Sequence, residues 1–234
     1  MRRSFRLCAG QLIAGRDWYN NDANPADDDG HGTHTTGTMV GRTVGVAGVA
    51  GAGSNVRVLV QKVCGRRGCP TSAIVNAIRA AADHPGMVAM NLSLGGPSES
   101  QAEKDAVAYA VDTKGVLIIA SAGNDGVATV GCPACDPLSI SVAATSWADG
   151  LAYYSNWGTG IDIAAPGGEM YSNTSGDGGI YSAVVDGYDF YQGTSMATPH
   201  VAAAAALVIS TGVTDPDRVE SVLKKSARDQ KDPK

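Results

Sequence analysis

The sequence lacks any uninterrupted apolar run approaching the roughly 20 residues that a membrane span needs. It also lacks a basic excess: 18 basic residues against 23 acidic ones leave a net charge of −5. A chain with this balance offers no positive field for a phosphate backbone. We therefore expect neither a membrane nor a nucleic acid as partner.

Charged residues (18%) and aromatic residues (6%) are scarce, whereas 44% of the residues are hydrophobic, which argues against disorder. Thirty glycines among 234 residues indicate tight turns and close backbone contacts. The length favours a single domain, residues 1–234, over two. We also recognise no signal peptide, because Arg6 and Gln11 interrupt the opening apolar stretch.

The cysteine count is odd, which permits two disulfides and one thiol, or no disulfide at all. The five residues are Cys8, Cys64, Cys69, Cys132 and Cys135. The spacing of the last four would also fit a four-thiolate zinc site. The pairing stays open at this stage.

From residue 56 onward, short apolar runs alternate with helical patterns, which is typical of β-α-β units and a parallel sheet. We expect strands at 56–63 (buried), 87–94, 116–121, 138–144 and 161–166, and a hairpin over 180–191 that turns at Asp186 and Gly187. Helices are expected at 71–83, at 98–114 with a Ser98/Gln101 capping box, and at 195–210. The pattern predicts an α/β fold.

Three segments place reactive side chains among small residues at element boundaries: DGHGTHTTGT (29–38), ASAGNDG (120–126) and GTSMATPH (193–200). Each has an ordinary explanation when taken alone. Ser195 could cap its helix, Asn124 could belong to a turn, and His31 could be a solvent-facing loop residue.

Together, the three segments match one mechanism. A serine hydroxyl becomes a good nucleophile when a neutral imidazole takes its proton, and the resulting oxyanion needs donors already aimed at it. Ser195 at a helix N-terminus offers a hydroxyl and a backbone N–H. Asn124, at the carboxyl end of a strand, offers a second donor, and His31 offers the base.

These motifs, in the order His31, Asn124, Ser195, resemble the subtilisin-type serine proteases (subtilases), and GTSMATPH is a highly specific one. The resemblance covers the chain from Leu12 to Ala227. It implies a mostly parallel, doubly wound sheet flanked by helices in a three-layer sandwich, and endopeptidase activity on polypeptide substrates. It assigns Ser195 as nucleophile, His31 as base and Asn124 as oxyanion-hole amide.

The resemblance also implies substrate contacts by an added strand and a specificity pocket. The matching residues are Ser93, Leu94, Gly95 and Gly96 for the strand, and Ser121, Ala122 and Gly123 for a pocket wall. The alternative is that these glycines merely end strands. His34 and His200 match structural positions of the family.

The family's triad includes an aspartate before the histidine, in a V-x-D-[ST]-G pattern that ends the first core strand, and this sequence has no such pattern. The stretch 12–30 matches the family just before the histidine, so we expect the aspartate and the first core strand to lie upstream of Met1. Asp17, Asp22 and 27–29 are not expected to replace it, because none is expected to end an apolar strand. The end also looks short, so the domain is expected to be incomplete at its N-terminus and perhaps its C-terminus.

Subtilisin loses about 3 × 10⁴ in kcat when this aspartate alone is removed, so we expect little activity from the chain as written. The main alternative is an inactive pseudoprotease or gene remnant that retains a peptide-binding groove. A metal-dependent hydrolase using His31, His34 and 27–29 is a third hypothesis, but it leaves GTSMATPH unexplained and no H-E-x-x-H is present.

An acidic loop precedes the histidine, and some family members bind calcium in the corresponding loop. Its candidate ligands are Asp17, Asn20, Asp22 and Asn24. We expect at most a structural calcium ion and no catalytic cofactor; the alternative is a solvated acidic loop. The resemblance further implies an extracellular monomer, a setting that favours disulfides over the zinc site.

Overall fold

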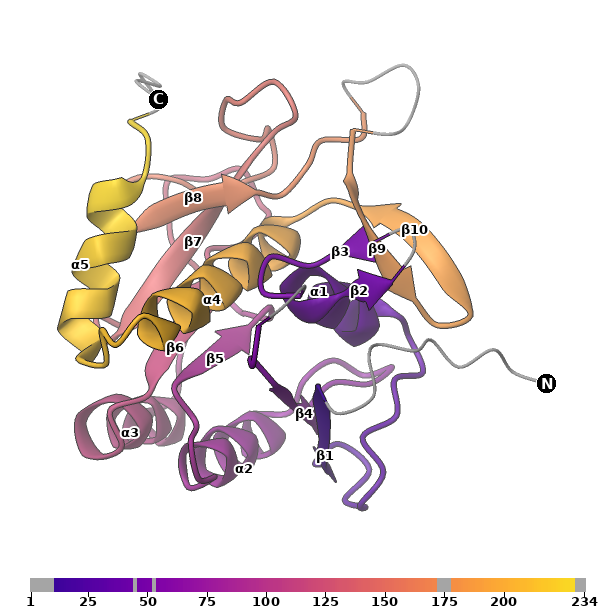
Figure 1. Ribbon diagram of the computed structural model, residues 1–234, viewed down its shortest axis with the longest axis vertical. Coiled ribbons are helices and arrows are strands. Elements are labelled where there is room, and N and C mark those ends of the chain that lie inside the picture. Colours follow the sequence, from indigo (N-terminus) through magenta and orange to yellow (C-terminus); the bar gives the residue numbers. More distant parts are fainter. Residues whose placement is uncertain (1–10, 44–45, 52–53, 172–177, 230–234) are drawn as a thin grey trace.

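The computed structural model describes residues 11–43, 46–51, 54–171 and 178–229 (Figure 1). A parallel four-stranded sheet runs in the order β5-β6-β7-β8. Its strands are β5 (Ala89–Leu92), β6 (Leu117–Ser121), β7 (Ser139–Thr145) and β8 (Ile163–Pro166). The four strands predicted from 87 onward are confirmed, each within two residues.

Helices cover both faces of this sheet. On one face α4 (Thr194–Ser210) packs in a core with Leu117 and Ile119. On the other, α2 (Thr71–Ala82) and α3 (Gln101–Ala108) pack in a second core with Ile118. Because alternate residues of a strand point to opposite faces, β6 supplies both cores and the protein has three layers.

A separate two-stranded sheet pairs β1 (Leu12–Asp17) in parallel with β4 (Val58–Lys62). The strand predicted over 56–63 exists, but the expectation that it is buried is wrong. Every residue of β4 is only half-buried, because β4 has a strand partner on one side alone in the described part of the chain. Strand β1 was not expected from the sequence, and Asp17 is its last residue, preceded by Gly15 and Arg16.

Helix α1 (His31–Val40), helix α5 (Pro216–Ser226), and the short antiparallel pair β2 (Arg42–Thr43) and β3 (Val46–Ala47) were not expected from the sequence. The helix predicted over 98–114 divides into α3 and a π-helical turn at Tyr109–Thr113. Its capping box uses Ser100 and Glu103 in place of Ser98 and Gln101. No described helix is long and apolar enough to cross a membrane.

The predicted hairpin forms from β9 (Ile180–Val184) and β10 (Gly187–Tyr191). Its turn lies one residue earlier than predicted, because Gly187 pairs with Val184 and leaves Val185 and Asp186 as the turn residues. Asp186 takes φ = +67°, a left-handed conformation that aspartate tolerates.

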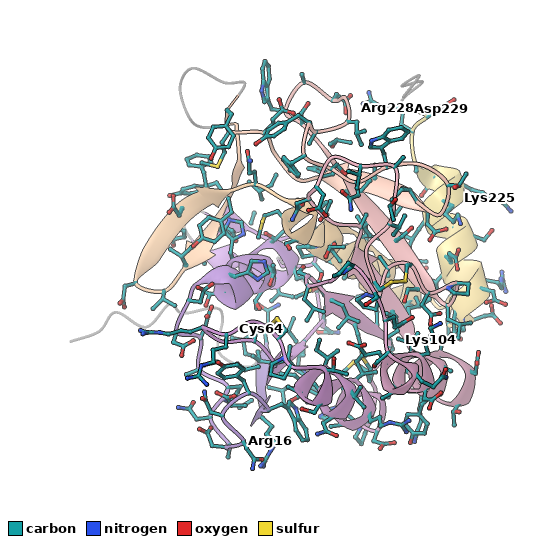
Figure 2. The ribbon with its side chains drawn as sticks, turned by 180° about the vertical axis from the view of Figure 1, so that it is seen from behind. Arg16, Cys64, Lys104, Lys225, Arg228 and Asp229 are labelled. Atoms are coloured by element: carbon teal, nitrogen blue, oxygen red, sulfur yellow. A yellow bond between two sulfur atoms is a disulfide. The ribbon has the colours of Figure 1, made fainter. Side chains whose placement is uncertain are left out.

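Two disulfides form, each within one loop: Cys64 with Cys69, and Cys132 with Cys135 (Figure 2). The pairing excludes a four-thiolate zinc site from these residues, since each sulfur is bonded to its neighbour. Cys8 lies outside the described residues. The second disulfide follows a backbone bridge between Gly96 and Cys132, so it holds the loop next to the predicted substrate edge.

Candidate active site

Ser195 lies in the first turn of α4, whose N-cap is Gly193 at φ = +148°, a conformation that other residues rarely adopt. A hydrogen bond fixes this turn, because the Gly193 backbone N–H donates to the Tyr154 hydroxyl oxygen at 2.9 Å. The Ser195 backbone N–H has no acceptor among the described residues. A free N–H at the positive end of a 17-residue helix is a natural donor to an anion.

The Asn124 side chain lies beside the same turn and has a fixed orientation. Its Oδ1 accepts hydrogen bonds from the Thr194 backbone N–H at 2.8 Å and from the Thr194 hydroxyl at 2.9 Å. Asn124 Nδ2 lies close to Gly193, since a Cβ atom added to this glycine would be 3.6 Å from it. Because Oδ1 is occupied and no described residue accepts from Nδ2, the amide N–H₂ is left as a donor next to Ser195.

Asn156 holds the loop that carries Asn124, a role that sequence reasoning missed. This residue is only 2% exposed; it accepts from Asp125 N at 2.9 Å and donates to Ala122 O at 3.1 Å. Gly123, at φ = +110°, allows this approach, because a Cβ there would lie 2.3 Å from Asn156 Nδ2. Nothing local signals the role, since Asn156 is 31 residues from Asp125 in sequence.

His31 is the first residue of α1, and the Asp27 side chain stabilises the start of this helix through hydrogen bonds. The Asp27 carboxylate accepts from Gly30 N at 3.0 Å and from Thr33 N at 2.7 Å, so it satisfies free amides of the helix start. Burial lowers the pKa of His31 below its usual range, although the charges of Asp29 and Asp27 oppose this. A lowered pKa favours the neutral imidazole that a general base requires.

No carboxylate orients the His31 ring in the described part of the chain, where the imidazole forms no hydrogen bond. Asp17, the acidic residue that ends β1, has other partners. It is 2% exposed, its two oxygens accept from Asn20 at 2.7 and 2.8 Å, and it lies 3.4 Å from Lys62 Nζ. The side chain is therefore not available to His31.

The two predicted substrate stretches lie at the carboxyl ends of β5 and β6 and contact each other. Ser93 joins the site directly: its hydroxyl donates to Ser195 O at 2.7 Å, and the Ser195 hydroxyl lies 3.4 Å from Ser93 O. The Ser121 hydroxyl donates to Leu94 O at 3.2 Å. Gly95 is exposed, whereas Ser121 and Ala122 are buried, so the second stretch can contribute mainly backbone.

The other two histidines of the motifs have structural partners. His34 is completely buried, stacks on Tyr191 at 4.5 Å and has Nε2 2.8 Å from Ile180 O. His200 has Nδ1 2.9 Å from Met196 O in its own helix. These contacts do not favour the metal-dependent hydrolase, and no group of three or more His, Cys, Asp or Glu side chains among the described residues could hold a metal ion.

Hydrogen bonds within the acidic loop engage the carboxylates of two of the four predicted calcium ligands. One Asp17 oxygen accepts from the Asn20 backbone N–H and the other from Asn20 Nδ2, so the side-chain nitrogen of Asn20 points toward Asp17. One oxygen of Asp22 accepts from Asn24 N at 2.7 Å. These hydrogen bonds occupy part of the acceptor capacity of Asp17 and Asp22, and calcium binding by the four residues stays a prediction.

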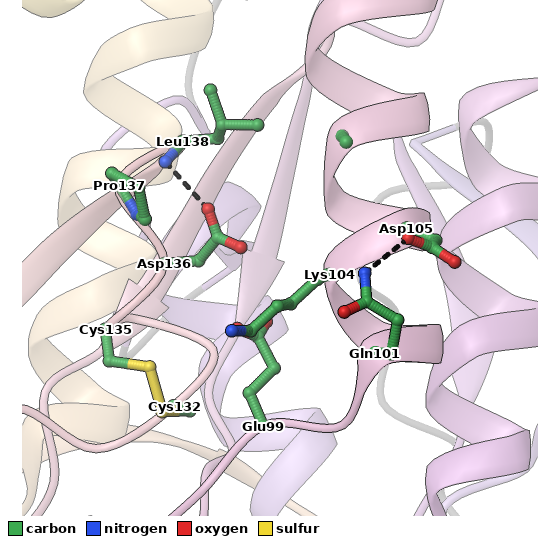
Figure 3. Close-up of a pocket in the computed structure, with 10 residues that line it drawn as sticks. Glu99, Gln101, Lys104, Asp105, Cys132, Cys135, Asp136, Pro137 and Leu138 are labelled. Carbon is green, nitrogen blue, oxygen red and sulfur yellow. Dashed lines mark hydrogen bonds between the residues drawn. A yellow bond between two sulfur atoms is a disulfide. The ribbon is translucent and has the colours of Figure 1, made fainter.

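A pocket of about 450 Å³ lies beside the Cys132–Cys135 disulfide and contains none of the predicted catalytic residues (Figure 3). Glu99 and Asp136 line it together with Lys104. Burial and the nearby charge of Asp136 raise the pKa of Glu99 to about 7. The pocket thus contains a carboxyl of raised pKa, away from the predicted catalytic residues.

A helix-start serine with a free backbone N–H, an oriented amide beside it and a histidine of lowered pKa are the groups that serine hydrolases use. The comparisons with known proteins agree. The model of the subtilase family (Peptidase S8) matches residues 13–234. The chain therefore belongs to the subtilase family of serine endopeptidases.

Individual relatives are also similar. A thermophilic serine proteinase of Bacillus sp. (strain AK1) is 40% identical over 204 residues, covering 87% of this chain and 48% of its own length. Thermitase of Thermoactinomyces vulgaris is 37% identical, covering 87% of this chain and 70% of its own. The chain thus spans about half the length of the first relative and more of the second.

The fold is similar to the crystal structure of a cold-adapted subtilisin-like serine proteinase. The two share 34% identity at a TM-score of 0.83, covering 96% of this chain and 77% of that one. This likeness confirms the predicted subtilisin-like α/β architecture.

Proposed function

We propose that the chain cleaves peptide bonds in polypeptides, with Ser195 as nucleophile, His31 as base, and Asn124 Nδ2 and the Ser195 N–H as oxyanion donors. The observation that carries this proposal is the double hydrogen bond from Thr194 to Asn124 Oδ1. It orients a side-chain donor beside a helix start whose own N–H is free, which is what a developing oxyanion needs.

In the proposed reaction the Ser195 hydroxyl attacks the carbonyl carbon of the scissile bond while His31 takes its proton. The negative charge on the carbonyl oxygen is held by the two N–H donors. His31 then gives the proton to the leaving amine, which departs. A water molecule next loses a proton to His31 and attacks the acyl carbonyl, and His31 returns that proton to the Ser195 oxygen as the acid product leaves. The exposed edge at Gly95 would pair with the extended substrate backbone.

The two disulfides support an extracellular or otherwise oxidising location. The inactive, groove-retaining form remains a second candidate, because no carboxylate among the described residues bonds to the His31 ring and fixes its tautomer. Labelling by a fluorophosphonate probe separates the candidates. Reaction with the folded chain that is lost in Ser195→Ala supports the enzyme, and no reaction with folded protein supports the inactive form.

Removal of the oriented amide should lower reactivity strongly. We expect Asn124→Ala to reduce kcat for a peptide substrate about 10²–10³-fold, the range for loss of the equivalent donor in subtilisin, a relative of this chain. Asn76→Ala, at an exposed position of α2, is the matched control and should leave the rate unchanged. Equal rates for the two variants would contradict the assigned role of Asn124.

The loss of labelling rate at acid pH should report the protonation of the His31 imidazole. Because burial lowers the pKa of His31, the imidazole stays neutral at pH values below the usual midpoint near 6.5. We expect the rate of labelling to be flat from pH 8 to about 6.5 and to fall only in more acid buffer. A midpoint above 6.5, or the same profile in His31→Ala, would rule out His31 as the base.

A further inference from the structure

The Cys132–Cys135 disulfide lies in a loop that contacts both predicted substrate stretches. Cys132 and Gly96 exchange two backbone hydrogen bonds, each of 2.9 Å. The neighbouring Gly131 N–H donates to Ala122 O at 2.8 Å. Gly96 belongs to the first stretch and Ala122 to the second, so the backbone of this one loop is bonded to both of them.

The loop and the two stretches pack closely, without side chains between them at these points. A Cβ atom added to Gly131 would be 3.3 Å from both Ala122 O and Gly96 O. One added to Gly95 would be 3.1 Å from Cys132 O. Because nothing flexible separates the three backbones here, a displacement of the loop must disturb both stretches.

No helix or strand supports the loop from within. The whole segment 122–138, between β6 and β7, is described, and none of it belongs to a helix or a strand. Around the cysteines the local support consists of turn hydrogen bonds, Cys135 N to Gly131 O at 3.0 Å and Asp136 N to Pro133 O at 3.1 Å, and of the disulfide. A crosslink limits the conformations that such a segment reaches when its hydrogen bonds open. The disulfide should therefore keep the loop against the stretches.

The chemistry of this crosslink favours exchange with an external thiol. Its sequence is Cys-Pro-Ala-Cys, and the Cys-X-X-Cys spacing is typical of cysteines that react in redox exchange. Cys135 is exposed, and both cysteines line the pocket of about 450 Å³ shown in Figure 3. The other pair, Cys64 and Cys69, has a wider spacing and two half-buried residues. Because exposed disulfides are reduced most readily, Cys132–Cys135 should open first.

We propose that Cys132–Cys135 is a redox-sensitive modification site, which a dithiol opens and which controls how tightly a polypeptide binds to the two substrate stretches. A thiolate of the dithiol attacks Sγ of Cys135, and Cys132 leaves as a thiolate that takes up a proton. The second thiol of the dithiol then displaces Cys135, which takes up a proton as well. Two cysteine thiols form, the dithiol becomes a disulfide, and an electron pair has moved to the protein.

The effect on binding rests on the part of the proposed function that pairs substrate backbone with the edge at Gly95; the reducible disulfide does not. The first experiment therefore measures reduction itself on the folded 234-residue chain. The chain is treated with graded dithiothreitol, the released thiols are alkylated, and the modified cysteines are located by mass spectrometry. We expect Cys132 and Cys135 to be alkylated about tenfold faster than Cys64 and Cys69, while circular dichroism shows folded protein. Alkylation of Cys64 and Cys69 first, or of Cys132 and Cys135 only after unfolding, would overturn the proposal.

Hydrogen exchange tests the link between the crosslink and the substrate stretches. In the reduced chain the amides of Gly96, Gly131 and Cys132 should exchange about tenfold faster than in the oxidised chain, because their acceptors lie across the contact between loop and stretches. The amides of α5 are the control and should be unchanged. Measurement by NMR resolves the individual amides, and unchanged exchange at all three would contradict the proposal.

Binding of a polypeptide is measured in the Ser195→Ala background, so that no turnover is needed. Fluorescein-labelled casein is the unfolded polypeptide, and fluorescence anisotropy gives its Kd. Reduction, or the double substitution Cys132→Ser with Cys135→Ser, should raise the Kd about tenfold, because a loosened edge must be ordered again on binding. The matched control, Cys64→Ser with Cys69→Ser, should leave the Kd unchanged. Equal Kd values for the oxidised and reduced forms would rule out the control of binding.

Reversibility separates local opening of the disulfide from unfolding. Treatment with oxidised dithiothreitol should restore the original Kd, and a loss of affinity that persists after reoxidation would overturn the proposal. Failure of the proposed function is detected separately, by fluorophosphonate labelling of Ser195 in the oxidised chain. A redox-dependent Kd without any labelling would support the modification site and remove the enzymatic reaction.

Discussion

The two sheets contain similar apolar residues but differ in burial. Every residue of β6 and β7 is buried, whereas every residue of β4 is only half-buried. Strands β6 and β7 each lie between two neighbouring strands, and β4 has a neighbour on one side. The difference shows that the number of strand partners, more than side-chain hydrophobicity, decides how much of a strand is removed from water.

Truncation of matched apolar residues should give the largest contrast between the sheets. Ile119 in β6 is completely buried, so Ile119→Ala should lower the free energy of unfolding by about 2–5 kcal/mol. Leu59 in β4 already borders a cavity of about 1840 Å³, so Leu59→Ala should cost about 1 kcal/mol. Urea denaturation of both variants measures the difference. Equal losses would mean that β4 is as well packed in solution as β6.

The sequence predicts the four-stranded part well because its two central strands, β6 and β7, are buried throughout and all four strands form short apolar runs. Helix α1 could not be predicted, since Gly32, Gly37 and its threonines are weak helix formers. It depends on packing against α4 and on the hydrogen bonds of Asp27. The half-burial of β4 could not be predicted either, because a strand's own residues do not reveal how many neighbours it has.

The candidate site divides in the same way. Ser195, Asn124 and His31 lie in short motifs and could be proposed from sequence. The support from Asn156 could not, and Ser93 was expected only as a substrate contact, because both act on the site through residues distant in the chain. No spacing rule connects a loop asparagine to a turn 31 residues away.

Charge pairing should matter more in the two-stranded sheet, where packing is weaker. Burial alone would raise the pKa of Asp17, but hydrogen bonds from Asn20 and the charge of Lys62 outweigh it and lower the pKa. Lys62→Met should therefore cost about 1–3 kcal/mol at pH 7, because Asp17 is 2% exposed and loses its counter-ion but keeps both hydrogen bonds from Asn20.

The matched control is Lys114→Met, which breaks the exposed pair with Asp83 and should change stability much less, because solvent screens an exposed ion pair. A depressed carboxyl pKa stabilises the fold above the unfolded value near 3.9, and this stabilisation is lost as pH falls through the folded value. The effect of Lys62→Met should accordingly shrink below pH 4. An effect independent of pH would assign it to lost packing of the lysine stem instead.

The smallest expected effect concerns Glu99, which lies in the part of the molecule built on the four-stranded sheet. Burial and the charge of Asp136 raise the pKa of Glu99 to about 7, so the folded state holds a proton that the unfolded chain releases near pH 4.3. Stability should therefore fall as pH rises from about 4.3 to 7, and Glu99→Gln should remove this slope. Because Glu99 is only partly buried, we expect a difference of about 1 kcal/mol or less between pH 5 and pH 8. Thermal unfolding of both proteins at the two pH values measures it, and a wild-type chain more stable at pH 8 than at pH 5 relative to Glu99→Gln would show that the acid is stabilised as an anion by groups around the pocket.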